Sequence, residues 1–154
     1  MAALSDYLES GLLNYVFRGQ SFTLPTNISI ALTSGVPADS NTGATIPECP
    51  SGINGVSTGY SRVSLGDPAS AGATAWSYLA DDDAQGSGVI KNSGQIVFNT
   101  ALLDWGWVSG VAIVDDSDYG EGKLLMHSQL SNPRQIYMGD NVKFDYQTLE
   151  ITFK

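Results

Sequence analysis

The sequence contains very little of the chemistry that disulfides and metal sites require. Its 154 residues include one cysteine, Cys49, and one histidine, His127. A single cysteine forms no intramolecular disulfide, so we expect the chain to fold in a reducing cytoplasm. Zinc sites need three or four nitrogen, sulfur or oxygen ligands, and the acidic stretch 115–122 lacks the ligand spacing of an EF-hand. We therefore expect no metal site and no cofactor.

Basic residues and long apolar runs are scarce as well. Seven Lys and Arg residues stand against 16 Asp and Glu residues, which gives a formal net charge of -9. Such a surface repels phosphate backbones and anionic lipids, so neither nucleic acid nor a membrane is expected as a partner. No run of about 18 apolar residues predicts a transmembrane helix. The first eleven residues lack the basic and apolar regions of a secretory signal.

What the sequence does contain is a series of short stretches in which apolar and polar residues alternate. Turn-forming residues separate these stretches, and this arrangement is typical of antiparallel sheets. The length indicates a single domain over residues 1–154. We therefore predict a mainly β fold, an antiparallel β-sandwich or barrel-like domain, with 60–154 as the main β region. The stretches are 28–33, 60–65, 105–114, 123–130, 142–146 and 149–153.

One short amphipathic helix is predicted over residues 5–18. Ser5 is a favourable N-cap, and Gly19 is placed to end the helix in the left-handed conformation. The helix carries an apolar stripe that covers either a sheet of its own domain or a neighbouring subunit. We name the central residues of this stripe as candidate interface residues. They are Leu8, Leu12 and Val16, and the stripe is widened by Leu13 and Phe17.

Residues 34–59 form a long stretch with almost no bulky side chains. It contains three of the six prolines and five of the 17 glycines. This composition predicts a loop, and loops of such length are usually functional or partly disordered. We expect it to be a long loop or an arm that becomes ordered on a partner.

One pattern matches a catalytic motif. Gly55–Gly59 fits the G-x-S-x-G nucleophile elbow, with Ser57 as nucleophile and His127 as the only available base. Asp104 or Asp116 would complete the chain order of a triad. The elbow, however, needs a strand before the serine and a helix after it, whereas here a Gly- and Pro-rich loop precedes a strand. We therefore expect no catalytic residues and no enzyme activity.

The large aromatic residues suggest a binding function instead of a catalytic one. Trp105 and Trp107 are predicted to face the same side of one strand, separated by Gly106. Aromatic side chains at such positions serve β-sheet cores and subunit interfaces, and they also form platforms for sugars. We favour core or interface and name both tryptophans as candidate interface residues.

Several short motifs follow one another along most of the chain. They are Leu4–Glu9, Leu12–Asn14, Phe17–Gly19, Ile28–Thr33, Gly59–Arg62, Asp104–Gly106, Leu124–Leu125, Gly139–Asp140 and Leu149–Thr152. Their order resembles small virion proteins of tailed bacteriophages, of the tail-fibre-like or capsid decoration type. This sequence departs from the pattern in its longer loop 34–59 and longer acidic turn 115–122.

This resemblance implies a structural protein of the virion that is made in the cytoplasm of the bacterial host. Our first hypothesis is a capsid decoration or cement protein, whose partners are the major capsid protein and further copies of itself. The alternative is a tail-fibre or baseplate-associated domain that binds tail proteins and forms a homo-oligomer. A carbohydrate-binding module that uses the aromatic residues is a third hypothesis. Copy number in the particle distinguishes the first two.

Overall fold

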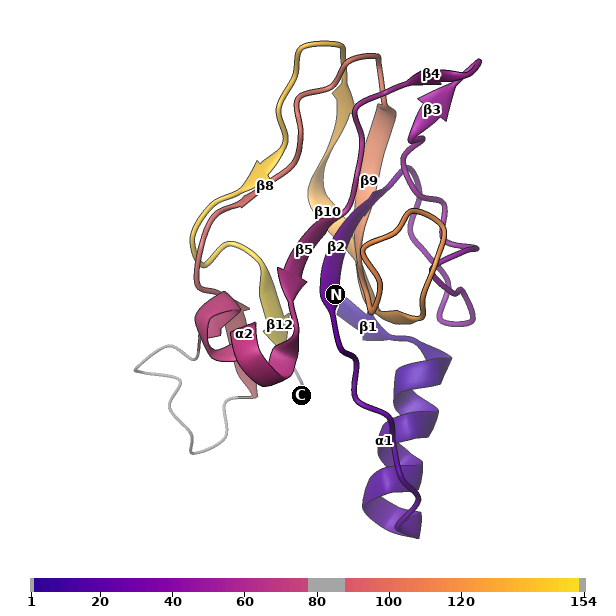
Figure 1. Ribbon diagram of the computed structural model, residues 1–154, viewed down its shortest axis with the longest axis vertical. Coiled ribbons are helices and arrows are strands. Elements are labelled where there is room, and N and C mark those ends of the chain that lie inside the picture. The colour runs from indigo at the N-terminus through magenta and orange to yellow at the C-terminus, as the bar shows by residue number, and fades with distance from the viewer. Residues whose placement is uncertain (1, 78–87, 153–154) are drawn as a thin grey trace.

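A five-stranded antiparallel sheet lies at the centre of the molecule (Figure 1). The computed structural model describes residues 2–77 and 88–152. Every neighbouring pair in this sheet is antiparallel. In spatial order the strands are β1 (Ala2–Leu4), β10 (Leu124–Ile136), β9 (Gly106–Val114), β2 (Ile28–Thr33) and β5 (Val63–Gly66).

Smaller sheets complete the fold. Side chains from two of them join the hydrophobic cluster built on Ile30 and Leu32 of the central sheet, which gives a sandwich-like arrangement. The predicted mainly β, antiparallel class is thereby confirmed. β12 also confirms the closing strand, while Phe153 lies outside the described residues. The sheets are β12 (Glu150–Thr152) with β7 (Val89–Asn92) and β6 (Trp76–Ser77), β8 (Ile96–Val97) with β11 (Lys143–Phe144), and β3 (Gly52–Ile53) with β4 (Val56–Ser57).

The 34–59 segment packs on the central sheet, with Cys49 in the cluster of Ile30 and Leu32 and Ile46 on the opposite face. Ile46 from this segment is buried in a second cluster that includes Ala31 and Ala112. Its backbone also pairs with β2, since Cys49 donates to the carbonyl of Leu32 at 3.0 Å. Glycines and prolines shape its turns, and these backbone bonds hold them against the sheet. The segment is therefore part of the folded domain and not a free arm.

In the part of the chain that the structure describes, two helices accompany the sheets, and the first begins and ends where the sequence predicts. In α1 (Asp6–Arg18), the Ser5 side chain accepts the N–H of Leu8, and Gly19 ends the helix with φ +62°. A second helix, α2 (Pro68–Ala75), occupies a stretch for which the sequence predicts neither a helix nor a strand. Its small residues carry almost no apolar periodicity, but Asp67 caps it and Pro68 suits the first helical position. Neither helix is long and apolar enough to cross a membrane, as judged over the described residues.

Strand β10 passes through Pro133, which lies beyond the predicted strand 123–130. Gln129 pairs with Gly110 and Arg134 pairs with Val108, so residues 130–133 lie opposite Ser109 alone. Within this bulge Pro133 does not need to donate a hydrogen bond to the neighbouring strand. Bulges are among the places where a sheet tolerates proline for this reason. β10 consequently continues to Ile136, six residues beyond the expected end at Leu130.

Candidate functional site

The residues of the catalytic motif do not form a catalytic arrangement. Ser57 lies in β4 of a short hairpin, and its hydroxyl accepts the N–H of Gly59 at 3.2 Å. His127 lies on β10, where its Nε2 is 2.9 Å from Oδ1 of Asp39. The serine thus sits in a strand-to-strand connection instead of an elbow that leads into a helix. Over residues 2–77 and 88–152, no three His, Cys, Asp or Glu residues are grouped to hold a metal ion.

A buried ion pair between Arg62 and Glu48 joins segments that are distant in the sequence. Nε and Nη2 of Arg62 donate to the two carboxylate oxygens of Glu48 at 2.9 and 2.8 Å. The exposed fractions of the two side chains are 0% and 3%. Two parallel N–H···O bonds form the strongest geometry between an arginine and a carboxylate. The pair therefore fixes the 34–59 segment to the chain that enters β5.

The remaining donors of Arg62 bind backbone carbonyl groups. Nη1 donates to the carbonyls of Asp116 at 3.1 Å and Glu121 at 2.8 Å, and Nη2 donates to that of Gly43 at 2.9 Å. All five N–H groups of the guanidinium are thereby used. The acidic turn between β9 and β10 thus closes over the ion pair.

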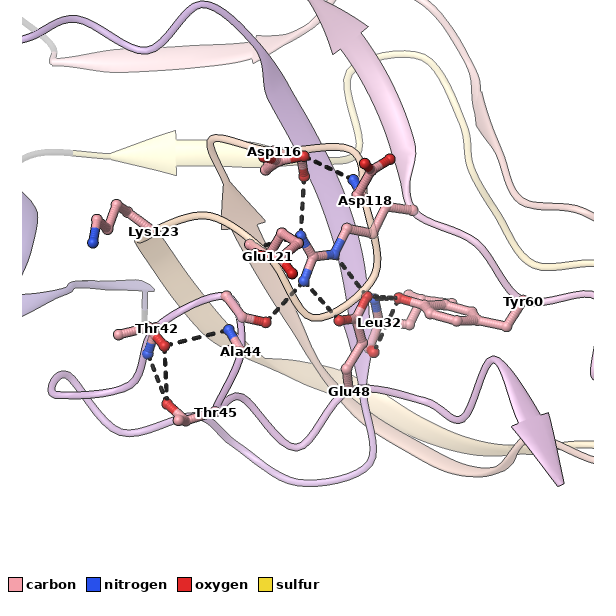
Figure 2. A network of polar contacts seen from close by, with 12 residues as sticks. Leu32, Thr42, Ala44, Thr45, Glu48, Tyr60, Asp116, Asp118, Glu121 and Lys123 are labelled. Atoms are coloured by element: carbon pink, nitrogen blue, oxygen red, sulfur yellow. Dashed lines mark hydrogen bonds and ion pairs between the residues drawn. The ribbon is translucent and has the colours of Figure 1, made fainter. Parts of the chain in front are cut away.

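Tyr60 completes this group, which we call the Arg62 cluster (Arg62, Glu48 and Tyr60). The Tyr60 hydroxyl donates to Oε1 of Glu48 at 2.8 Å and accepts the N–H of Leu32 at 3.0 Å. Figure 2 shows Glu48 in contact with Tyr60, near the loop that carries Asp116 and Glu121. Burial, and then the charge of Glu48, raises the pKa of Tyr60 far above its ordinary value. Burial alone would lower the pKa of Arg62, but the hydrogen bond and charge of Glu48 raise it.

The Arg62 cluster explains why residues 59–62 have the pattern Gly-Tyr-x-Arg. Gly59 has φ +78°, which favours glycine, and the next residues place Tyr60 and Arg62 on the same carboxylate. Gly43 must also be small, because an added Cβ would collide with the carbonyl of Glu121. The sequence alone does not reveal Glu48, since it lies in a loop without periodicity.

Cys49 lies next to this cluster and is completely buried. Burial, and then the charge of Glu48, raises the pKa of the Cys49 thiol from 9.0 to about 12. The thiolate is the reactive form of cysteine. We therefore expect native protein at pH 8 to resist 5,5′-dithiobis(2-nitrobenzoic acid), and protein in 6 M guanidinium chloride to release one equivalent of thionitrobenzoate. Fast labelling of the native protein would contradict this burial.

The same pKa shift predicts a loss of stability at alkaline pH. The raised pKa contributes stability that is fully present below pH 9 and is lost as pH rises towards about 12. Urea unfolding at pH 8, 9 and 10 should show a falling free energy of unfolding, and Cys49→Ala should flatten this fall. The raised pKa of Tyr60 adds to the fall near pH 10 in both proteins, so the difference between their curves reports the thiol. Parallel curves for the two proteins would contradict the assignment.

The two candidate interface tryptophans have different surroundings. Trp105 is 3% exposed, and its Nε1 donates to the carbonyl of Thr58 at 2.9 Å. Trp107 is 56% exposed at the start of β9. Gly106 between them has φ +80°, which breaks the alternation of a regular strand. The expectation that both face the same side is therefore wrong, since Trp105 is a core residue and only Trp107 reaches the surface.

Helix α1 is anchored at its first turn. Ser5 donates its backbone N–H to Leu125 at 2.9 Å, its hydroxyl donates to the carbonyl of Leu124, and Leu8 packs against the main hydrophobic cluster. Beyond this turn the helix projects away from the sheets (Figure 1). The chain then returns beside it, with Phe22 against Gly11.

The projecting part of α1 exposes apolar side chains, and none of its residues is buried. We call these residues the α1 tip. The stripe that the sequence indicates is therefore present, but only Leu8 of its members packs against the core. A helix of 13 residues is only marginally stable by itself and gains most of its stability when its apolar face packs against another surface. An uncovered apolar face on this helix therefore costs free energy. The α1 tip comprises Leu12 (37% exposed), Leu13 (58%), Tyr15 (60%), Val16 (65%) and Phe17 (78%).

An open cleft of about 950 Å³ lies in the other half of the molecule. We call it the β10 cleft, because residues 130–132 and 134–136 of β10 form one wall and residues 140–145 form the other. Trp107 lies in its lining. Figure 1 shows the loop from β10 to β11 at the end of the molecule opposite α1. The sequence gives no signal for this cleft, because the bulge that shapes it is not predicted.

Residues 3–152 match the protein family described as podophage GP4 fiber I protein gp80. The chain belongs to this fibre family. No curated protein matches it. Membership confirms the resemblance to small tailed-phage virion proteins, and it identifies the chain as a phage structural protein of the fibre type. Of the two particle locations that the sequence left open, fibre-family membership favours the fibre and gives no support to the capsid shell.

Proposed function

We propose that the chain is a non-enzymatic structural subunit of a phage tail fibre within the virion. Membership in the fibre family over residues 3–152 carries this proposal. The dispersed positions of Ser57 and His127, each with its own hydrogen-bond partner, support a structural role over a hydrolytic one. The cluster that binds three segments together suits a subunit that must remain folded outside the cell.

The α1 tip is proposed to be the surface that joins this subunit to a second copy of the chain. Its five apolar residues carry no charge, so two copies can pack their helices together there although each chain has a formal net charge of -9. Homo-oligomers with closed symmetry are the commonest assemblies. Tail proteins that meet the oligomer are its further proposed partners.

Gold-labelled antibody against the purified protein tests the location. Bound to intact virions, the gold particles should be found at the tail in negative-stain images. Gold distributed over the capsid shell would contradict the fibre proposal and favour a decoration protein. Virions treated with pre-immune serum provide the control for non-specific label.

A further inference from the structure

Three loops meet at the end of the molecule opposite α1 (Figure 1). We call them the distal loops, and they are residues 51–59, 100–105 and 137–141. Gly139 donates to the carbonyl of Ala101 at 2.8 Å, and Ala101 donates to that of Asp140 at 2.9 Å. Leu102 donates to the carbonyl of Thr58 at 2.8 Å, which joins the first loop to the second. The distal loops therefore form one connected unit.

Two carboxylates and a glycine fix this unit further. Oδ1 of Asp104 accepts the N–H of Met138 at 2.8 Å, and Oδ2 of Asp140 accepts the N–H of Tyr137 at 2.9 Å. Gly59 lets the first loop approach closely, because an added Cβ would lie 2.8 Å from a carbonyl oxygen of the second loop. The backbone is thus ordered before any partner binds, so binding costs little conformational entropy there.

The distal loops expose large apolar side chains in spite of these contacts. Leu102 is 59% exposed, Tyr137 is 52% exposed and Met138 is 68% exposed. We call these three residues the distal patch. Leu102 and Met138 are neighbours, because each lies next to one residue of the bond between Ala101 and Gly139. Aromatic residues and methionine are enriched in protein interfaces, and an exposed apolar patch marks a site of interaction.

The charges beside the distal patch are all negative. The distal loops contain Asp104 and Asp140 and no Lys or Arg, and both acids are exposed. This combination is complementary to a surface with an apolar centre and Lys or Arg around it. The same patch on a second copy of the chain is a poor match, because like charges would then face each other.

We propose that the distal patch docks on a different protein of the virion, one with an apolar surface bordered by Lys or Arg. This inference rests on the proposed function, in which the α1 tip joins copies of the chain. The distal patch lies at the opposite end, so it stays free in such an oligomer and forms its contact with tail proteins. Each copy contributes one patch, and several modest contacts together bind tightly.

Photo-cross-linking in intact virions tests this proposal. Three phage variants each carry p-benzoylphenylalanine in place of one exposed tyrosine. Tyr137→p-benzoylphenylalanine, in the distal patch, should join the chain to a different virion protein, which mass spectrometry identifies. Tyr146 lies outside the distal loops and the α1 tip and is 60% exposed, so its variant is the matched control and should give no such product.

The third variant separates this proposal from the proposed function. Tyr15 lies in the α1 tip and is also 60% exposed, so its variant should give a product of two copies of the chain. Absence of that product concerns the contact between copies and leaves the distal patch unaffected. A product of the Tyr137 variant with the major capsid protein would support the distal patch and contradict the fibre location.

Binding of the purified chain to the protein identified by the cross-link tests the chemistry of the patch. Met138→Asp should weaken the affinity by at least about tenfold in calorimetry, because it places a third carboxylate where an apolar contact stood. Added salt should weaken the binding of the wild-type protein, because it screens Asp104 and Asp140. Val97→Asp is the control, since Val97 is 46% exposed in β8, and it should bind as the wild type does.

Three results would overturn the proposal. The first is no product with another protein from virions that contain the Tyr137 variant, and the second is a product made only of two copies of the chain. The third is equal binding by Met138→Asp, whose thermal unfolding should match the wild type because Met138 is exposed. Met138→p-benzoylphenylalanine is a second cross-linking variant, which keeps the test decisive if the Tyr137 variant does not fold.

Discussion

Arg62→Ala should lower the free energy of unfolding by about 3–5 kcal/mol, which is the usual cost of removing one partner of a buried ion pair. For a chain of this length, each kcal/mol shifts the midpoint of thermal unfolding by roughly 2–4 °C. The expected fall in melting temperature is therefore roughly 6–20 °C. Calorimetry and urea unfolding at pH 7 measure both quantities.

The large effect follows from what the substitution leaves behind. The carboxylate of Glu48 remains buried, with Tyr60 as its remaining partner. The carbonyls of Gly43, Asp116 and Glu121 lose the donors that hold the two loops together. An unpaired buried charge and three unsatisfied acceptors are each costly, and no side chain nearby replaces the guanidinium fork.

Arg134→Ala is the matched control, because Arg134 is exposed and unpaired among the described residues. It should change the free energy of unfolding by less than about 0.5 kcal/mol. Glu48→Leu combined with Arg62→Met should cost less than the sum of the single variants, since neither charge is then left alone. A loss below about 1 kcal/mol for Arg62→Ala would contradict the central role of the Arg62 cluster.

Leu13→Asp combined with Phe17→Asp should convert the proposed homo-oligomer to a folded monomer. Burial of one large apolar side chain contributes about 1.5–3 kcal/mol, so two charged replacements should weaken association by at least about 100-fold. Sedimentation velocity at several protein concentrations measures this change. Because both side chains are exposed in the single chain, the thermal unfolding of the monomer should stay close to that of the parent domain.

Leu102→Asp provides the control for the added charge. Leu102 is 59% exposed, against 58% for Leu13, and it lies outside α1. This variant should associate as the wild type does. An unchanged oligomer for the double variant, or equal dissociation by Leu102→Asp, would show that the α1 tip is not the contact between copies.

The sequence predicts those parts of the fold that depend on local physics. Ser5 and Gly19 mark the ends of α1 because a cap requires only neighbouring residues. The alternation in β2 and β9 likewise identifies the central sheet. Helix α2 is missed, because its small residues carry no apolar pattern.

Other features depend on contacts between distant residues or on backbone geometry. Arg62 meets Glu48 across 14 residues and Glu121 across 59, and no local pattern encodes either contact. Gly106 reverses the expected side of Trp105 through a positive φ. The β10 cleft depends on a bulge around Pro133. A proline considered without its neighbours in space indicates a turn and not a bulged strand.

The copy number of the protein in purified virions tests the fibre proposal most directly. Quantitative mass spectrometry with isotope-labelled peptides gives its ratio to the major capsid protein in the same particles. A fibre subunit should be present at a small fraction of the number of capsid subunits. A number comparable to that of the capsid protein would contradict the fibre proposal and indicate a protein that covers the shell.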